Sequence, residues 1–227
     1  MSRLSRLSGN RTILRTIYYM WVVFPYPIRK LLTAGGIAGI LGMKKLFRVD
    51  HKNDPTPMDD LGNLSFWGVP EIDLDRYTLE VTGEVEKPLK LNFDDLTKME
   101  AVEGPVRMDC VGGFRNNSTM KGVMFTTFLN VSAAKDDAVA VAFHCADGYY
   151  TTHLISDLLE SDAFLAYEIN GQQLDRFGFP LRLVAPGTYG YKWAKWIVRM
   201  EVLNHFPKGY WENKGLPKRG QVGETWG

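Results

Sequence analysis

Cys110 and the loop that follows it form the segment of this sequence best suited to chemistry. The cysteine ends the short apolar run PVRMDC (105–110) and is followed by Gly112, Gly113, Arg115, Asn116 and Asn117. Paired glycines let a ligand approach the backbone closely. An arginine offers a planar fork of donors to an anion. We therefore expect this loop to border a binding site.

Three uses of Cys110 are open from the residues alone. A catalytic nucleophile needs a histidine within reach, but His144 and His153 fall on other expected strands. A buried structural cysteine is the commonest case. A thiolate that ligates a soft or redox metal suits the glycine loop better. One thiolate cannot hold a metal by itself, so the other ligands would have to come from a cofactor.

The composition sets the size of the protein. The chain has 227 residues, of which 45% are hydrophobic, enough for one large domain or two small ones. A net charge of +1 gives no reason to expect nucleic acid. Two cysteines are too few for a disulfide framework, although one bridge remains possible.

Charge divides the chain at about residue 50. Residues 1–49 contain nine basic side chains and no acidic one. Because the whole chain has 27 basic and 26 acidic residues, the other 178 residues hold 18 basic against 26 acidic ones. This asymmetry predicts a basic leader, 1–49, and one main domain, 50–227.

The leader has three possible roles. Its apolar blocks, 17–24 and 31–43, are too short to span a bilayer. Its basic and aromatic residues suit an interfacial anchor on anionic lipid, or an arm that binds a partner. An export or organelle signal is the second reading, and a plain tail is the third. The protein would be membrane-associated or cytoplasmic, or exported or organellar if the leader is a targeting signal.

The main domain reads as rich in strands. Alternating or continuous apolar runs predict strands at 76–85, 89–93, 105–110, 138–145, 148–155, 180–186 and 195–203, and a hairpin with an Asn-Gly turn at 163–174. Short helices are expected at 94–99, with an aspartate as its cap, and from Thr126 or Thr127 to Ala134. The turn-rich segment 209–227 should wrap the surface. Together these elements predict an α+β domain on a mixed sheet.

Residues 64–212 resemble the molybdopterin-binding domain of the sulfite oxidase family, which includes stand-alone bacterial oxidoreductases. Six blocks carry the resemblance in order: VPEIDLDRYTLEVTGEVEKPLKLNFDDL, MDCVGG, FHCADGYYTTHL, LLESDAFLAYEINGQQL, GFPLRLVAPGTYGYKWAKWI and GYWE. The resemblance implies the strand-rich α+β fold of that family. It also implies a molybdenum–molybdopterin cofactor and two-electron chemistry.

The resemblance assigns catalytic roles to three residues. Cys110 corresponds to the cysteinate that ligates molybdenum. Arg115 stands where the family's arginine helps to bind an anionic substrate. Tyr149 matches a tyrosine beside the metal's oxo group, and strand alternation turns its neighbour Tyr150 to the opposite face.

Further residues correspond to the family's cofactor contacts. The pterin ends in a phosphate, which needs donors and positive charge. Three basic side chains and two backbone positions match its contacts: Arg182, Lys192, Lys195, Gly190 and Tyr191. Cys145 lies near a position where related bacterial enzymes use a hydroxyl close to the cofactor, so a contact there and a buried spare cysteine are both open.

Two departures from the family pattern leave an alternative function open. Leu64-Ser65-Phe66 aligns with an Arg-Asn-His run, and Phe177 stands where relatives have a histidine. The leading hypothesis is oxygen-atom transfer on a small oxo-anion or sulfoxide. Its electrons would pass through a separate partner such as a membrane cytochrome, since no haem-binding domain is recognised in this chain. The alternative is a cofactor-less, non-catalytic subunit of a membrane-associated complex.

Overall fold

Two β-sheets form the body of the protein in the computed structural model, which describes residues 11–46, 55–65 and 68–225. The first sheet has five strands in the order β2-β1-β10-β5-β6. Their bounds are Leu89–Leu91, Leu79–Gly83, Ile197–Leu203, Ala140–Cys145 and Tyr150–Leu154. β1 runs parallel to β10, and the other neighbours are antiparallel, so this sheet is mixed as predicted.

The second sheet is antiparallel. It follows the order β3-β4-β7-β8, with β9 also paired to β7. The bounds are Ala101–Asp109, Arg115–Met124, Phe164–Ile169, Gln172–Gln173 and Arg182–Val184. The predicted hairpin in 163–174 is confirmed, because β7 and β8 turn at Asn170 and Gly171, both with positive φ.

Strand β4 corrects the expectation that the loop after Cys110 continues through Asn117. Arg115, Asn116 and Asn117 already belong to the strand and pair with β3. Their polar side chains hid the strand, but β4 lies between β3 and β7 and finds backbone partners on both sides. Alternate residues of β4 are buried, including Asn116 and Ser118.

The short helices lie where they were predicted, but with different caps. In α4 (Phe93–Lys98) the cap is the side chain of Asn92, which accepts from the Asp95 amide at 2.9 Å, and not an aspartate. Neither threonine caps α5 (Phe125–Ser132). Its first amide donates instead to the Ala163 carbonyl at 3.0 Å, so a neighbouring backbone satisfies the helix end.

One continuous apolar core joins the two sheets to the short helices, which include α6 (Ile155–Glu160). Leu79, Phe143 and Met200 of the first sheet and Val123 and Leu165 of the second are completely buried in it. The described residues also form four single-turn helices. Two of them connect strands: η2 (Asp175–Phe177) lies between β8 and β9, and η3 (Gly190–Lys192) between β9 and β10. η1 (Met58–Asp60) precedes β1, and η4 (Glu212–Lys214) follows β10. Because the core fixes the ends of both sheets, it also fixes the loops that leave them.

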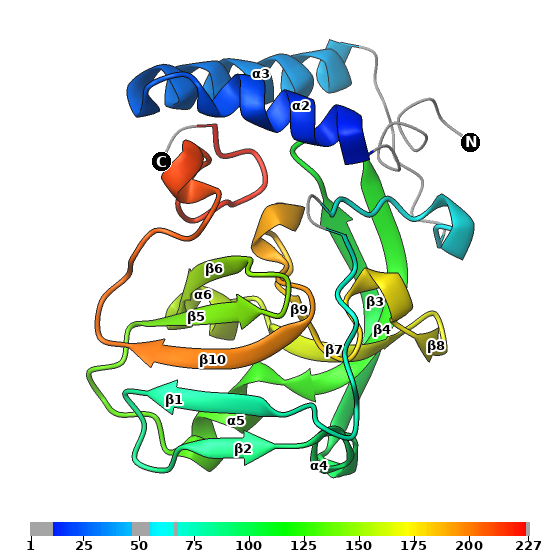
Figure 1. The fold of residues 1–227 in the computed structure, drawn as a ribbon, viewed down its shortest axis with the longest axis vertical. Helices are drawn as coiled ribbons and strands as arrows, with labels where there is room; N and C mark the ends of the chain where they lie inside the picture. The colour runs from blue at the N-terminus through cyan, green and yellow to red at the C-terminus, as the bar shows by residue number, and fades with distance from the viewer. Residues whose placement is uncertain (1–10, 47–54, 66–67, 226–227) are drawn as a thin grey trace.

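The N-terminal segment forms a helical hairpin. α2 (Arg11–Val22) and α3 (Tyr26–Leu46) lie side by side along one end of the molecule, next to the C-terminal segment that contains η4 (Figure 1). None of the helices in the described ranges is long and apolar enough to cross a bilayer. The structure therefore shows much of the predicted leader as a packed hairpin.

Candidate active site

The Cys110 loop is a tight connection between β3 and β4. The Cys110 amide donates to the Phe114 carbonyl and the Gly113 amide donates to the Cys110 carbonyl, both at 2.9 Å. Gly113 has φ +92°, a conformation that favours glycine. The Gly112 amide points at Cys110 Sγ, 3.4 Å away. The glycines therefore shape the loop around the sulfur and let a backbone donor reach it.

The electrostatics of Cys110 depend mainly on burial. Its side chain is 7% exposed, and burial raises the pKa of the thiol to about 11. The Gly112 amide and the charge of Lys44 on α3 act in the opposite direction and favour the thiolate. Cys110 and Cys145 are both free thiols, so the bridge that the sequence left possible is not formed.

A cavity of about 210 Å³ opens beside Cys110. It lies where loops from both sheets meet below the helical hairpin. Its walls combine four of the predicted site side chains with apolar and aromatic neighbours. Those four side chains are Cys110, Tyr149, Arg182 and Lys195, and Gly190 and Tyr191 of η3 also border the cavity.

Tyr149 projects from the turn between β5 and β6. Its hydroxyl donates a short hydrogen bond to the Tyr191 carbonyl, and its amide donates to Asp147 Oδ1 at 3.1 Å. Burial raises the pKa of Tyr149 well above its ordinary value, so the phenol stays protonated. Tyr150 does not border the cavity; it contacts Tyr210 and Asn213 instead.

Arg182 is a buried cation that no carboxylate neutralises among the described residues. It is 6% exposed. Its Nη1 donates to the Phe177 carbonyl at 2.9 Å, Nη2 approaches Met108 Sδ at 3.9 Å, and Nε has no partner. Burial lowers the pKa of Arg182 to about 10. A buried guanidinium with an orphaned donor at a cavity wall is suited to an anionic ligand.

Lys195 adds a second positive group at the same wall. Its Nζ donates to Asn63 Oδ1 at 2.6 Å and to the Leu64 carbonyl at 2.8 Å. Burial, with repulsion from Arg182, lowers the pKa of Lys195 to about 7. An anion placed between the two cations would favour the protonated lysine. The residues present therefore fit the phosphate of a pterin cofactor.

Two predicted site residues are held elsewhere by ion pairs. Arg115 makes a two-pronged contact with Asp109, with Nε–Oδ1 at 2.9 Å and Nη2–Oδ2 at 3.1 Å, and does not border the cavity. Lys192 is completely buried and pairs with Glu212 Oε1 at 2.5 Å. Its Nζ also donates to backbone carbonyls of Thr152 and Lys218. This explains how a lysine can be fully buried.

The remaining predicted positions are close to the cavity but outside its walls. Cys145 is buried at the end of β5, and burial raises the pKa of its thiol. The side chain of Phe177 is buried. Its backbone carbonyl contributes to the site by accepting a hydrogen bond from Arg182 Nη1. Phe66 lies outside the described residues. Leu64 belongs to the same segment that departs from the family's Arg-Asn-His run, and its backbone carbonyl accepts a hydrogen bond from Lys195 Nζ.

The helical hairpin covers this end of the body. Trp211, which borders the cavity, packs against Tyr18 and Trp21 of α2 with ring centroids 5.9 and 5.8 Å apart. The Tyr18 and Tyr210 hydroxyls are 2.6 Å apart. On the other side, a Cβ placed on Gly113 would lie 3.6 Å from Ile40 Cγ2 of α3. The hairpin thus contacts both the aromatic rim and the Cys110 loop.

Sequence reasoning did not assign several residues of the site. Asn63 and Asp147 bring polar groups, and Met108, Phe114 and Trp193 form apolar walls. Their types alone carry no chemical signal, because such residues are common in any core. Only the proximity of Asp147 to Tyr149, in the block FHCADGYYTTHL, pointed to one of them.

The fold and the site define a class: a strand-rich α+β domain with a buried cysteine and two cationic side chains around one cavity. Residues 66–211 match the family described as "Oxidoreductase molybdopterin binding domain". The chain belongs to this family. The predicted family and fold class are therefore confirmed, and this family is one of molybdopterin-dependent oxidoreductases.

Named relatives support this assignment. The chain is 38% identical over 148 residues to the Azospira oryzae protein named "Putative protein-methionine-sulfoxide reductase subunit YedZ1", covering 65% of this chain and 56% of that one. It thus spans little more than half of that relative. Human mitochondrial sulfite oxidase is 30% identical over 178 residues, or 64% of this chain and 32% of that one.

A solved structure has the same fold. The sulfane dehydrogenase SoxCD from Paracoccus pantotrophus superposes with a TM-score of 0.64 at 23% identity. The match covers 68% of this chain and 45% of that one. At this identity the likeness extends to the fold alone.

Proposed function

We propose that this protein is a molybdopterin-dependent oxidoreductase that transfers an oxygen atom to or from a small sulfoxide-type substrate. One observation carries the proposal. A buried cysteine, a half-buried tyrosine and two cations without carboxylate ion-pair partners in the described residues border one cavity. The orphaned donor of Arg182, beside a second cation in the same wall, supports a bound anion there.

Four side chains would hold and orient the cofactor. Cys110 would ligate the metal as a thiolate. Arg182 and Lys195 would bind the terminal phosphate, and Tyr149 would stand beside the reacting centre. When bound, the cofactor supplies a metal that cycles between oxidation states two electrons apart. The protein contributes position, charge and the exclusion of water.

Backbone groups would complete the cofactor site. Gly190 and Tyr191 border the cavity through η3, where the backbone can approach a pterin closely. In that position, the carbonyl of Tyr191 holds the Tyr149 hydroxyl in one orientation. We therefore assign Gly190 and Tyr191 to cofactor contact and to the positioning of Tyr149.

The part of the cavity wall next to Cys110 favours a neutral substrate over an anion. Leu64, Val111, Phe114 and Leu216 provide apolar surface near Cys110. Arg115, predicted to bind an anionic substrate, is already neutralised by Asp109. Its anion-binding role would require this ion pair to open. Reduction of a sulfoxide would consume two electrons and two protons and release a sulfide and water.

The electrons would come from a separate redox partner. The Azospira relative is named as a subunit, which supports a multicomponent system. The sequence led us to consider a membrane cytochrome, and this stays a proposal. The partner's contact surface is not needed to test the chemistry, because a small reduced dye can replace it.

The test combines metal analysis with two assays. Purified protein should contain stoichiometric molybdenum and should oxidise a reduced viologen dye when a dialkyl or methionine sulfoxide is added. Sulfite oxidation with ferricyanide is the comparison assay for an oxo-anion substrate. The variant Cys110→Ser is the negative control, with Cys145→Ser as its matched partner.

Each outcome has a definite meaning. Molybdenum with sulfoxide turnover supports the proposal. Molybdenum with sulfite turnover alone would contradict the substrate class and restore the oxo-anion. Folded protein that takes up no molybdenum when it is expressed with a complete cofactor supply would favour the non-catalytic subunit.

A further inference from the structure

We propose that the outer face of the α2–α3 hairpin docks on an anionic lipid bilayer without crossing it. This face is formed by the exposed apolar residues of the two helices and by the basic residues beside them. The proposal concerns a surface away from the cavity and does not depend on the chemistry carried out there.

An apolar stripe runs along the whole length of α3. Its exposed members recur three or four residues apart and therefore share one helix face: Ile28, Leu31, Leu32, Gly35, Gly39, Gly42, Met43 and Leu46. Leu31 is 64% exposed and Leu46 is 76% exposed. A helix packed only against its own body would turn such a stripe inward.

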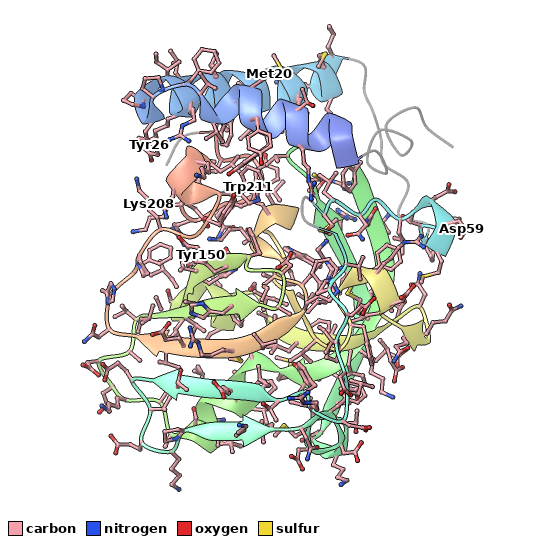
Figure 2. All side chains as sticks on the ribbon, viewed as in Figure 1. Met20, Tyr26, Asp59, Tyr150, Lys208 and Trp211 are labelled. Carbon is pink, nitrogen blue, oxygen red and sulfur yellow. The ribbon has the colours of Figure 1, made fainter. Side chains whose placement is uncertain are left out.

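The second helix extends the same surface. Tyr19, Met20, Val23 and Phe24 are exposed on α2 and in the turn that follows it, and Met20 is 66% exposed. Figure 2 shows Met20 on the outer side of the hairpin, while Trp211 and Lys208 lie on the side of the body. Among the described residues, nine of the fifteen exposed large apolar side chains belong to this hairpin, so they are concentrated on it.

The inner face of the hairpin is already in use, which leaves the outer face as the docking surface. Ile37 is buried, and Trp21 and Tyr18 pack on Trp211. Lys208 donates to the Tyr26 hydroxyl at 2.8 Å. These contacts fix the orientation of both helices, so the apolar stripe is presented in a set direction.

The positive charge of the hairpin indicates which surface binds its outer face. Residues 1–49 carry no carboxylate, and Arg15 and Lys45 are exposed on the described helices. An anionic leaflet attracts such residues, at about fivefold in partitioning for each cation. Tyrosine and phenylalanine beside them suit the headgroup layer. A second copy of the chain is disfavoured, because a symmetric contact would bring the two basic hairpins together.

Docking in this way would also place the cavity near the membrane. The hairpin lies between the patch and the rim formed by Trp211, and a helix with its side chains is about 10–12 Å thick. The cavity would then lie roughly one helix layer from the lipid surface. A redox partner or substrate in the membrane would be within short reach.

The experiment measures binding of the full chain to vesicles of phosphatidylcholine, with and without phosphatidylglycerol, at low and high salt. The apolar test variant is Met20→Glu with Leu31→Glu. Its matched control is Val131→Glu with Leu159→Glu, which adds the same charges at exposed apolar positions on α5 and α6. Lys45→Gln tests charge, and Lys98→Gln is its control, because both lysines are exposed in the last turn of a helix.

We expect the wild type to bind vesicles that contain phosphatidylglycerol, with weaker binding in high salt. The Met20→Glu/Leu31→Glu variant should bind at least tenfold more weakly, and Lys45→Gln about fivefold more weakly. Both controls should match the wild type. Circular dichroism and thermal unfolding should confirm that every variant is folded.

Three results would overturn the proposal. The first is a folded wild type that does not bind anionic vesicles. The second is equal binding by the apolar test variant and its control. The third is a wild-type dimer, measured by light scattering, that the Met20→Glu/Leu31→Glu variant converts to a monomer, because a second copy would then cover this face.

Discussion

Arg182 and Lys195 pair across an antiparallel β-bridge, so two cations share one wall of the cavity. Their mutual repulsion contributes to the lowered pKa of Lys195. Within the described ranges, neither has a carboxylate ion-pair partner to balance its charge. Two neighbouring buried cations lower the stability of the folded protein when no ligand is bound, and a bound anion between them would offset that cost.

Replacing Arg182 should weaken cofactor retention. Losing a charge-assisted contact costs about 1.5–3 kcal/mol, or roughly ten- to hundredfold in affinity. We expect Arg182→Met to lower the molybdenum content of dialysed protein. Arg176→Met is the control, because Arg176 is exposed only six residues away. Equal molybdenum loss in both variants would argue against a phosphate site at Arg182.

Replacing Cys110 should remove the metal while the fold survives. Metal binding needs the thiolate, although burial raises the pKa of the free thiol, so the metal must displace a proton. We expect Cys110→Ser to lose more than about 100-fold in activity, beyond the 10–100-fold typical of an outer-shell change. Cys145→Ser, at the other buried free cysteine, should keep its molybdenum. Full activity in Cys110→Ser would refute the ligand assignment.

Replacing Lys192 should act on stability. A buried pair that loses one partner costs about 3–5 kcal/mol, which corresponds to a Tm decrease of roughly 6–20 °C in a chain of this size. Lys192→Met should show this decrease, and Lys192→Met with Glu212→Leu should recover much of it. If the double variant regains stability but not molybdenum, Lys192 contacts the cofactor as the family resemblance implies.

The cofactor-free protein should become more stable as the pH rises from 7. Lys195 has a pKa of about 7 in the folded protein, against about 10.4 in an unfolded chain. Between these values the unfolded state holds more protons, so stability increases with pH by up to ~1.4 kcal/mol per pH unit. Arg182, Asp147 and Cys145 are the groups that act on this lysine.

Denaturant titrations at pH 6.5, 7.5 and 8.5 would measure this effect. Near pH 8.5 the thiols of Cys110 and Cys145 act in the opposite direction, because burial raises their pKa above that of an unfolded cysteine; this affects wild type and lysine variants alike, so the contribution of Lys195 is the difference between them. Lys195→Met should flatten the pH dependence, and Lys121→Met, on the exposed side of β4, should not. The same pH dependence in the wild type and in Lys195→Met would mean that Lys195 remains protonated over the window.

Arg115 distinguishes the two substrate classes. Because it is paired with Asp109, Arg115→Met should leave the KM for a sulfoxide within about twofold and should instead reduce stability by about 1 kcal/mol. If the arginine opens to bind an anion, the KM for sulfite should rise about ten- to hundredfold. Steady-state kinetics on both substrates separates the two cases.

The sequence by itself determined the family and most strands, and it singled out a cysteine that borders the cavity. Six blocks in order carry the resemblance, and period-two patterns such as YTLEV mark strands because successive side chains face opposite sides. The Asn-Gly hairpin followed from local backbone preferences. These are local signals, readable without knowing what packs against them.

Only the tertiary structure decided which charges reach the cavity. In the sequence three basic residues look alike: Arg115, Lys192 and Lys195. In the structure Arg115 pairs with Asp109 and Lys192 pairs with Glu212, whereas Lys195 borders the cavity. The same holds for α2 and α3, whose inner and outer faces differ because Trp211, far along the chain, packs on one of them. Long-range contacts assign partners, and no local pattern encodes them.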